Sequence, residues 1–199
     1  GSNISDNVSR SDGWTVGGGI SNTGWLVITG SNIQDNYSHG TGGGIYSGSS
    51  SNLTIVDSTI SGNSVFYGYG GEGGGVAAHG ALTIVDSLFQ ANEVSAFDYS
   101  VWGSAVSASG TTSIGGSTFY ANRPNPGYDQ SSSVVNNSGN MTITNSTFSS
   151  NQGEYSDDSA IENHGVLTIT NSTITGSDIG IVATCDYYTG DSLTQLRRT

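Results

Sequence analysis

A repeating unit of 26 to 30 residues constrains this chain more than any other feature of its sequence. The template unit, residues 73–92, begins with a Gly-rich tetrapeptide, continues through a Leu-Thr-Ile segment and ends in a Phe-x-x-Asn motif, and the other units copy it with substitutions. The apolar residue that opens this last motif recurs from Ile4 to Ile174, at intervals of 29, 27, 29, 30, 29 and 26 residues. A fixed period of this length is typical of solenoids, in which each repeat packs against its neighbours. We therefore expect one continuous body.

Each unit contains three short stretches that we predict to be β-strands. In the unit 73–92 the first ends at Val76, the second is Leu82-Thr83-Ile84, and the third ends at Phe89. The second alternates apolar and polar residues with the period of two that a strand requires. Each strand is too short to form a sheet alone, so it must pair with its equivalent about 4.8 Å along the axis. The prediction is an all-β, right-handed parallel β-helix of six to seven coils over residues 1–184, followed by a non-repetitive tail at 185–199.

Polar residues recur in register with the strands. An Asn closes each unit, and we predict that these side chains stack and hydrogen-bond along the axis, because Asn both tolerates a left-handed turn and carries an amide. The predicted Asn ladder consists of Asn7, Asn36, Asn63, Asn92, Asn122 and Asn151. A second turn row, each member followed by Ser, consists of Asp57, Asp86, Asn145 and Asn171. The Gly residues before the first strand are expected to form a tight corner that glycine tolerates.

The chain is strongly acidic, which excludes several kinds of partner. Its net charge is −12, and its four basic residues are all Arg. Binding to phosphates needs many clustered cations, so we expect neither nucleic acid nor an anionic membrane surface as a partner. No run approaches the roughly 20 apolar residues of a membrane span, so membrane insertion is not expected either. The single cysteine, Cys185, allows no internal disulfide.

Aromatic and acidic residues gather in the variable segments between each Asn and the next Gly-rich start. These segments, which we call the loop edge, are residues 8–16, 37–41, 64–72, 93–102, 123–131 and 152–157. Their 48 residues hold ten of the 18 aromatic residues and seven of the 16 acids. Insertions in a solenoid often form its binding face, and exposed rings beside acids suit sugars or protein surfaces. The alternative is that the loops fold back and bury their rings.

We predict that the loop edge binds a glycan or a surface protein without catalysing a reaction. The residues expected to carry this binding are Tyr67, Tyr69, Asp98, Tyr99, Trp102, Tyr128 and Asp129.

A polysaccharide-active enzyme is an alternative. A lyase of this architecture would need a basic residue, and Arg10 and Arg123 are the only ones in the repeats. A glycosidase needs two carboxylates about 5–9.5 Å apart. Pairs that could lie so close are Asp98 with Asp129, or two among Asp157, Asp158 and Glu162, although such pairs also arise by chance in an acidic chain.

No metal or other cofactor is expected. Asp57 and Asp86 would stack one coil apart and could share Ca²⁺ through oxygen ligands, but solvated turn residues are the simpler interpretation. The three histidines lack metal-ligand spacing. His79 and His164 occupy the same kind of turn before a Gly. We interpret these two and His39 as surface residues.

Outward Thr residues permit a further alternative, ice binding. Thr142-Ile143-Thr144 and Thr168-Ile169-Thr170 would each place two Thr on one outer face, with Thr54 and Thr83 in the same row. However, Val56, Val85 and Gly115 interrupt the second column, and β-branched residues favour strands for their own sake.

The paired Gly-Gly-x-Ile/Val and Phe-x-x-Asn motifs resemble the repeat of polymorphic outer-membrane proteins and related bacterial surface β-helix proteins. The resemblance covers about residues 2–181. It implies the right-handed coil, which parallel crossovers also favour, and a location outside the cell or on its surface. It is compatible with an adhesive or ligand-binding module, with a stalk or filament subunit that stacks end to end, and with a glycosidase or lyase.

Overall fold

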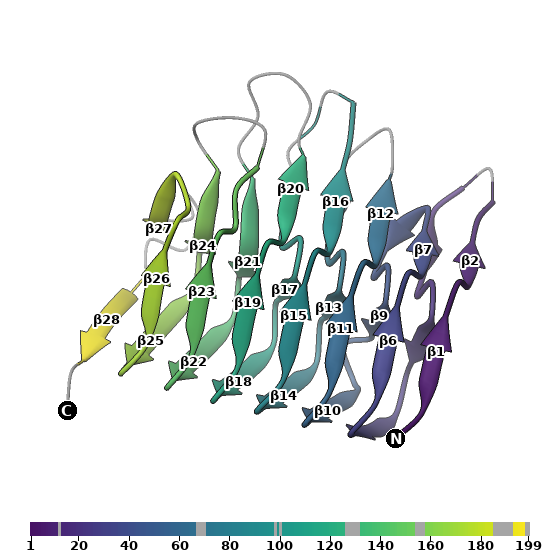
Figure 1. The fold of residues 1–199 in the computed structure, drawn as a ribbon, viewed down its shortest axis with the longest axis horizontal. Helices are drawn as coiled ribbons and strands as arrows, with labels where there is room; N and C mark the ends of the chain where they lie inside the picture. Colours follow the sequence, from purple (N-terminus) through teal and green to yellow (C-terminus); the bar gives the residue numbers. More distant parts are fainter. Residues whose placement is uncertain are drawn as a thin grey trace.

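The computed structural model describes residues 1–11, 13–66, 71–97, 99, 101–125, 132–153, 158–184 and 193–197. Regular structure in these residues is entirely β, and all strand pairs are parallel. The chain visits the three largest sheets in the same order on every turn, so the strands stack into a solenoid (Figure 1). The predicted all-β, parallel β-helix is confirmed.

Three sheets have seven strands each. Sheet 1 contains β1 (Asn3–Ser5), β6 (Asn32–Gln34), β11 (Thr59–Ser61), β15 (Leu88–Gln90), β19 (Thr118–Tyr120), β23 (Thr147–Ser149) and β26 (Thr173–Thr175). Sheet 2 contains β5 (Trp25–Thr29), β10 (Asn52–Val56), β14 (Ala81–Val85), β18 (Thr111–Gly115), β22 (Asn140–Thr144), β25 (Val166–Thr170) and β28 (Leu193–Arg197). Sheet 3 contains β4 (Ile20–Asn22), β9 (Ile45–Ser47), β13 (Val76–Ala78), β17 (Val106–Ala108), β21 (Ser133–Asn137), β24 (Ser159–Asn163) and β27 (Ile179–Ala183).

Two smaller sheets lie toward the loop edge. Sheet 4 contains β2 (Val8–Ser9), β7 (Tyr37–Ser38), β12 (Ser64–Phe66), β16 (Glu93–Ser95) and β20 (Arg123–Asn125). Sheet 5 contains β3 (Thr15–Val16) and β8 (Gly40–Thr41).

Sheets 3, 2 and 1 are the three predicted strands of each unit, in that order along the chain. The first strand was expected to end at Val76, but β13 begins there, because the preceding Gly residues form the corner. Gly73 in that corner has φ of 65°, a left-handed conformation that glycine adopts without strain. Residues 185–199 were predicted to be a non-repetitive tail. Within them, β28 pairs with β25 and extends sheet 2.

Sheet 4 adds a fourth strand to each of the first five coils, which the sequence patterns did not predict. Its strands begin directly after the Asn row, in residues assigned above to the loop edge. Val65 and Val94 point inward from β12 and β16 and form a small buried cluster with Ala96 and Val101. The base of the loop edge is therefore regular, with a core of its own.

Register pairing places like side chains above one another in the main core. Leu53 pairs with Leu82 and Ile55 with Ile84 across β10 and β14. Phe89, Phe119 and Phe148 form a stack, with ring centroids 5.0 and 4.5 Å apart and interplanar angles of 16° and 2°. Rows of identical residues thus fill the interior coil by coil.

The predicted Asn ladder is confirmed. Asn63 donates from its backbone N–H and from Nδ2 to Oδ1 of Asn92, at 3.1 and 3.0 Å, and Asn92 repeats the pattern toward Asn122. The second Nδ2 hydrogen of Asn92 goes to the Ile60 carbonyl at 2.8 Å. However, the left-handed residue is the one before each Asn, such as Ala91 with φ of 52°. The Asn backbone N–H must point along the axis, so the preceding residue makes the bend.

A parallel Ser ladder lies at the other turn. The backbone N–H of Ser58 donates to Ser87 Oγ at 3.2 Å, and Ser87 Oγ donates to the Val85 carbonyl at 2.7 Å. The same pattern links Ser2, Ser31, Ser58, Ser87, Ser117, Ser146 and Ser172. The predicted turn row just before these residues is confirmed, because Asp57, Asp86, Asn145 and Asn171 have φ between 47° and 50°. The Ser that follows each turn residue was the visible signal for this second ladder.

Candidate functional site

The described part of the loop edge exposes aromatic rings. Of the seven residues predicted to bind a ligand, Tyr99 and Trp102 are described, with 46% and 39% of their surface exposed. Phe97, between the predicted residues, is 65% exposed and makes an edge-to-face contact with Phe66 at 5.0 Å. The other five predicted residues, Tyr67, Tyr69, Asp98, Tyr128 and Asp129, lie outside the described residues.

Regular backbone structure holds Trp102 in place. Its N–H donates to the Gly71 carbonyl at 3.1 Å, and its carbonyl accepts from Gly73 N–H at 3.0 Å. Glu72 pairs with Trp102 as an isolated bridge, immediately beside Val101 of the small buried cluster. The backbone of Trp102 is therefore held by β-bridge hydrogen bonds, and the residue before it, Val101, is part of the small buried cluster. For Phe97, Tyr99 and Trp102, the alternative in which the loops bury their rings does not hold.

The outer face of sheet 2 is flat and neutral. The first six strands of this sheet contain no charged residue. Thr54, Thr83, Ser113, Thr142 and Thr168 pair in register and form one outward column. Trp25 and Val27, at the first strand, are 88% and 68% exposed. The Thr row exists as predicted, with Ser113 interrupting it. Trp25 is an exposed indole that lies on sheet 2 and not in the loop edge.

A polar cluster on sheet 3 joins residues that the sequence did not connect. Glu72 Oε1 lies 3.2 Å from His79 Nε2, and Glu72 Oε2 accepts a hydrogen bond from Ser107 Oγ at 2.9 Å. His79 Nδ1 lies 3.1 Å from Ser109 Oγ, and the Tyr46 ring packs on the imidazole with centroids 5.6 Å apart. His79 was interpreted above as a plain surface residue; it is instead partly covered and has a partner on each ring nitrogen.

The two charged partners shift each other's pKa. Burial acts to raise the pKa of Glu72, but hydrogen bonds from His79 and Ser107 and the charge of His79 outweigh burial and leave this pKa below its ordinary value. The hydrogen bond to Glu72 raises the pKa of His79, with burial opposing and the carboxylate charge assisting.

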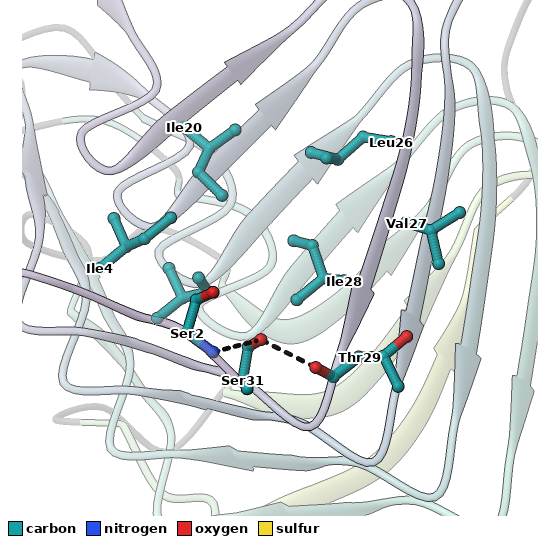
Figure 2. A pocket seen from close by; sticks show the side chains of 10 residues that line it. Ser2, Ile4, Ile20, Leu26, Val27, Ile28, Thr29 and Ser31 are labelled. Carbon is teal, nitrogen blue, oxygen red and sulfur yellow. Dashed lines mark hydrogen bonds between the residues drawn. The ribbon is translucent and has the colours of Figure 1, made fainter.

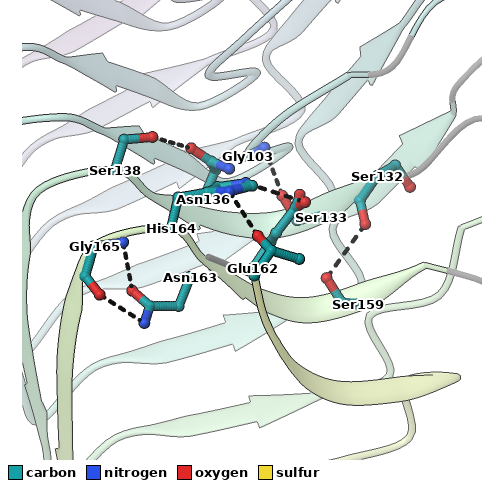
Figure 3. A network of polar contacts seen from close by, with 11 residues as sticks. Gly103, Ser132, Ser133, Asn136, Ser138, Ser159, Glu162, Asn163, His164 and Gly165 are labelled. Atoms are coloured by element: carbon teal, nitrogen blue, oxygen red, sulfur yellow. Dashed lines mark hydrogen bonds and ion pairs between the residues drawn. The ribbon is translucent and has the colours of Figure 1, made fainter. Parts of the chain in front are cut away.

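A second carboxylate–imidazole pair lies further along the same sheet. Figure 3 shows Glu162 and His164 beside Asn136, and Glu162 Oε1 is 3.1 Å from His164 Nε2. His164 Nδ1 lies 2.7 Å from Thr184 Oγ1. Of the acids considered for a glycosidase, Glu162 is thus paired with His164 and Asp158 contacts Ser132. Asp98, Asp129 and Asp157 lie outside the described residues.

A hollow of about 380 Å³ lies in the first coil. Figure 2 shows its lining, which includes Ile4, Ile20, Leu26 and Ile28. These side chains belong to the same rows as the main core, and the only hydrogen bonds drawn there belong to the Ser ladder. The hollow is therefore part of the core rather than a binding site.

The described residues contain neither a metal-binding cluster nor a membrane-spanning helix. No group of three or more His, Cys, Asp or Glu side chains there is placed to hold a metal ion. No helix in this part of the chain is long and apolar enough to cross a bilayer.

Comparisons of the chain with protein-family models, curated proteins and solved structures return no significant match. The family resemblance stated above thus stays a prediction that rests on the two repeated motifs.

Proposed function

We propose that this protein is a binding module of the cell exterior, and that its loop edge holds a glycan without reacting with it. The observation that carries this proposal is the exposure of three rings that are close in sequence, Phe97, Tyr99 and Trp102, the last of which is held through its backbone by the preceding coil. Side chains of this size are normally buried, and exposed aromatic surface marks interaction sites. Tyr and Trp combine an apolar face with a polar tip, which suits the faces and hydroxyl groups of sugar rings.

The charge of the protein favours a neutral glycan over an anionic one. The chain carries 16 acids against four Arg. The guanidinium of Arg10 lies over the Tyr37 ring, 5.3 Å from its centroid, so one of the four Arg is already in a cation–π contact. An anionic polysaccharide would therefore meet net repulsion at low salt. A surface protein remains the alternative occupant, because exposed aromatic residues also suit protein interfaces.

The proposal is tested by size-exclusion chromatography of the protein mixed with neutral and acidic polysaccharides. We expect at least one neutral polysaccharide to co-elute with the protein at unchanged length. Shortening of the polysaccharide would contradict a non-catalytic loop edge. Co-elution with none of them would contradict glycan binding and favour a protein partner.

Two tryptophan variants locate the binding surface. Trp102→Ala removes a ring from the loop edge, whereas Trp25→Ala removes a more exposed ring from the face of sheet 2. Truncation of a central aromatic contact typically costs about 2 kcal/mol of binding, roughly a thirtyfold weaker Kd. We expect this loss for Trp102→Ala and an unchanged Kd for Trp25→Ala. The reverse order would move the site to sheet 2.

A further inference from the structure

Glu72, the last residue of its loop-edge segment, forms a continuous hydrogen-bonded chain with His79 and Ser109, and none of the three is among the residues proposed above to bind the glycan. Glu72 precedes β13, His79 follows β13, and Ser109 follows β17 one coil later. The contacts are 3.2 Å from Glu72 Oε1 to His79 Nε2 and 3.1 Å from His79 Nδ1 to Ser109 Oγ. A hydroxyl, an imidazole and a carboxylate in this order are the groups of an activated nucleophile, its base and the orienting acid.

The surroundings of Glu72 determine which imidazole nitrogen carries the proton. Both carboxylate oxygens of Glu72 have a donor, because Oε1 faces His79 and Oε2 accepts from Ser107. A carboxylate held in this way keeps the proton of the neutral imidazole on Nε2. The lone pair of Nδ1 then faces Ser109 Oγ, as a general base requires. Tyr46 packs against the ring and holds its plane.

The stacked turn at which Ser109 lies provides an internal comparison. His79, Ser109, Ser138, His164 and Thr184 occupy equivalent positions in successive coils. The hydroxyl of Ser138 bonds to Asn136 and not to an imidazole. Thr184 does contact His164, but Glu162 Oε2 in that cluster is buried without a hydrogen-bond partner among the described residues. Glu72 is therefore the better fixed of the two carboxylates.

We propose that Ser109 is the nucleophile of an ester-hydrolysing site, with His79 as its general base and Glu72 as the residue that positions His79. Ser109 Oγ attacks the ester carbonyl carbon while His79 Nδ1 takes the hydroxyl proton. The bond to the alcohol oxygen then breaks, and His79 returns the proton to the departing alcohol. Water attacks the acyl-serine by the same route, His79 taking its proton and returning it to Ser109, which releases the carboxylic acid.

The neighbouring backbone and the exposure of Ser109 fit a small acyl ester carried on the surface of a larger molecule. Gly110 N–H, next to the nucleophile, forms no hydrogen bond with the described residues and is available to the developing oxyanion. Ser109 is exposed, so the ester can be carried by a large molecule.

The first experiment measures hydrolysis of p-nitrophenyl acetate by the whole protein and by two serine variants. Ser109→Ala removes the nucleophile, and Ser138→Ala removes the equivalent hydroxyl that has no imidazole. We expect hydrolysis above the buffer rate in the wild type and in Ser138→Ala, and its loss in Ser109→Ala. Equal rates in the wild type and Ser109→Ala would overturn the proposal, as would no rate above buffer.

The second experiment identifies the modified residue directly. An alkyl fluorophosphonate should attach to Ser109 and leave Ser138 unmodified, as read by peptide mass spectrometry. His79→Gln should slow the labelling by roughly a hundredfold, the usual contribution of a general base. Glu72→Gln tests positioning, because without the carboxylate the pKa of His79 falls and the pH–rate profile should shift to lower pH. Labelling at both serines, or at neither, would overturn the proposal.

Discussion

At the residue scale, this structure depends on side chains that donate and accept hydrogen bonds along one axis. A buried Asn amide does both, since Nδ2 donates to the next coil while Oδ1 accepts from the previous one. Asn36, Asn63, Asn92 and Asn122 are fully buried, so water cannot replace a lost partner. One residue type can therefore repeat without limit along the row, and removing one member leaves its neighbours unsatisfied.

Replacing Asn92 by Ala should destabilise the protein by about 3 kcal/mol, because the Asn63 N–H and the Ile60 carbonyl lose their buried partners. The measurement is the free energy of unfolding from urea denaturation. Asn140→Ala is the matched control, since Asn140 is exposed on β22 and should cost less than about 0.5 kcal/mol. Similar losses for both variants would show that the ladder adds nothing to stability.

The Glu72–His79 pair should make part of the stability depend on pH. The pKa of Glu72 is lowered from 4.5, so its contribution is present above that value and is lost as the pH falls through the folded pKa. The pKa of His79 is raised from 6.5, so its contribution is present below that value and is lost as the pH rises through the folded pKa. Both contributions are complete between the two values.

Glu72→Gln should therefore lower the urea midpoint most at about pH 5.5 and less at about pH 8.5. Ser138→Ala serves as an uncharged control on the same outer face, and its effect should not change with pH. A Glu72→Gln effect that is equal at both pH values would show that the ion pair does not contribute.

At the element scale, the repeat period made the three main ladders predictable, because the same apolar pattern returns at nearly constant spacing. The boundaries of the strands were harder to predict from the sequence. Sheet 3 begins at Val76 rather than ending there, since the Gly corner precedes it. Sheet 4 was missed because β12 and β16 each bury a single Val, too few residues for an alternation to be recognised.

The stacked Phe row provides a test of packing between elements. Phe119 is fully buried between Phe89 and Phe148. Phe119→Ala should cost about 4 kcal/mol, because it leaves a cavity between two rings that cannot both close on it. The adjacent Tyr120→Ala changes a ring that is 44% exposed and should cost less than about 1 kcal/mol. Equal unfolding free energies for the two variants would contradict the stacked interior.

At the scale of the whole molecule, charge and rings are segregated. The strands of sheet 1 and the first six strands of sheet 2 carry no charged residue, so the acids among the described residues lie in turns, in sheets 3 and 4 and at the loop edge. The enrichment of aromatic residues in the loop edge could be predicted from the sequence. Trp102 and Tyr99 are exposed, as a binding role requires. The Glu72–His79–Ser109 chain could not be predicted from the sequence, because its three residues lie in separate segments that only the stacking of the coils brings together.

The most direct test of binding at the loop edge uses the intrinsic fluorescence of the three tryptophans. One protein keeps only Trp102 (Trp14→Phe, Trp25→Phe), and the other keeps only Trp25 (Trp14→Phe, Trp102→Phe). Both indoles are exposed before binding. On titration with a co-eluting polysaccharide, Trp102 emission should shift to shorter wavelength as the ring loses water, and Trp25 emission should stay constant. A shift at Trp25 with none at Trp102 would contradict binding at the loop edge.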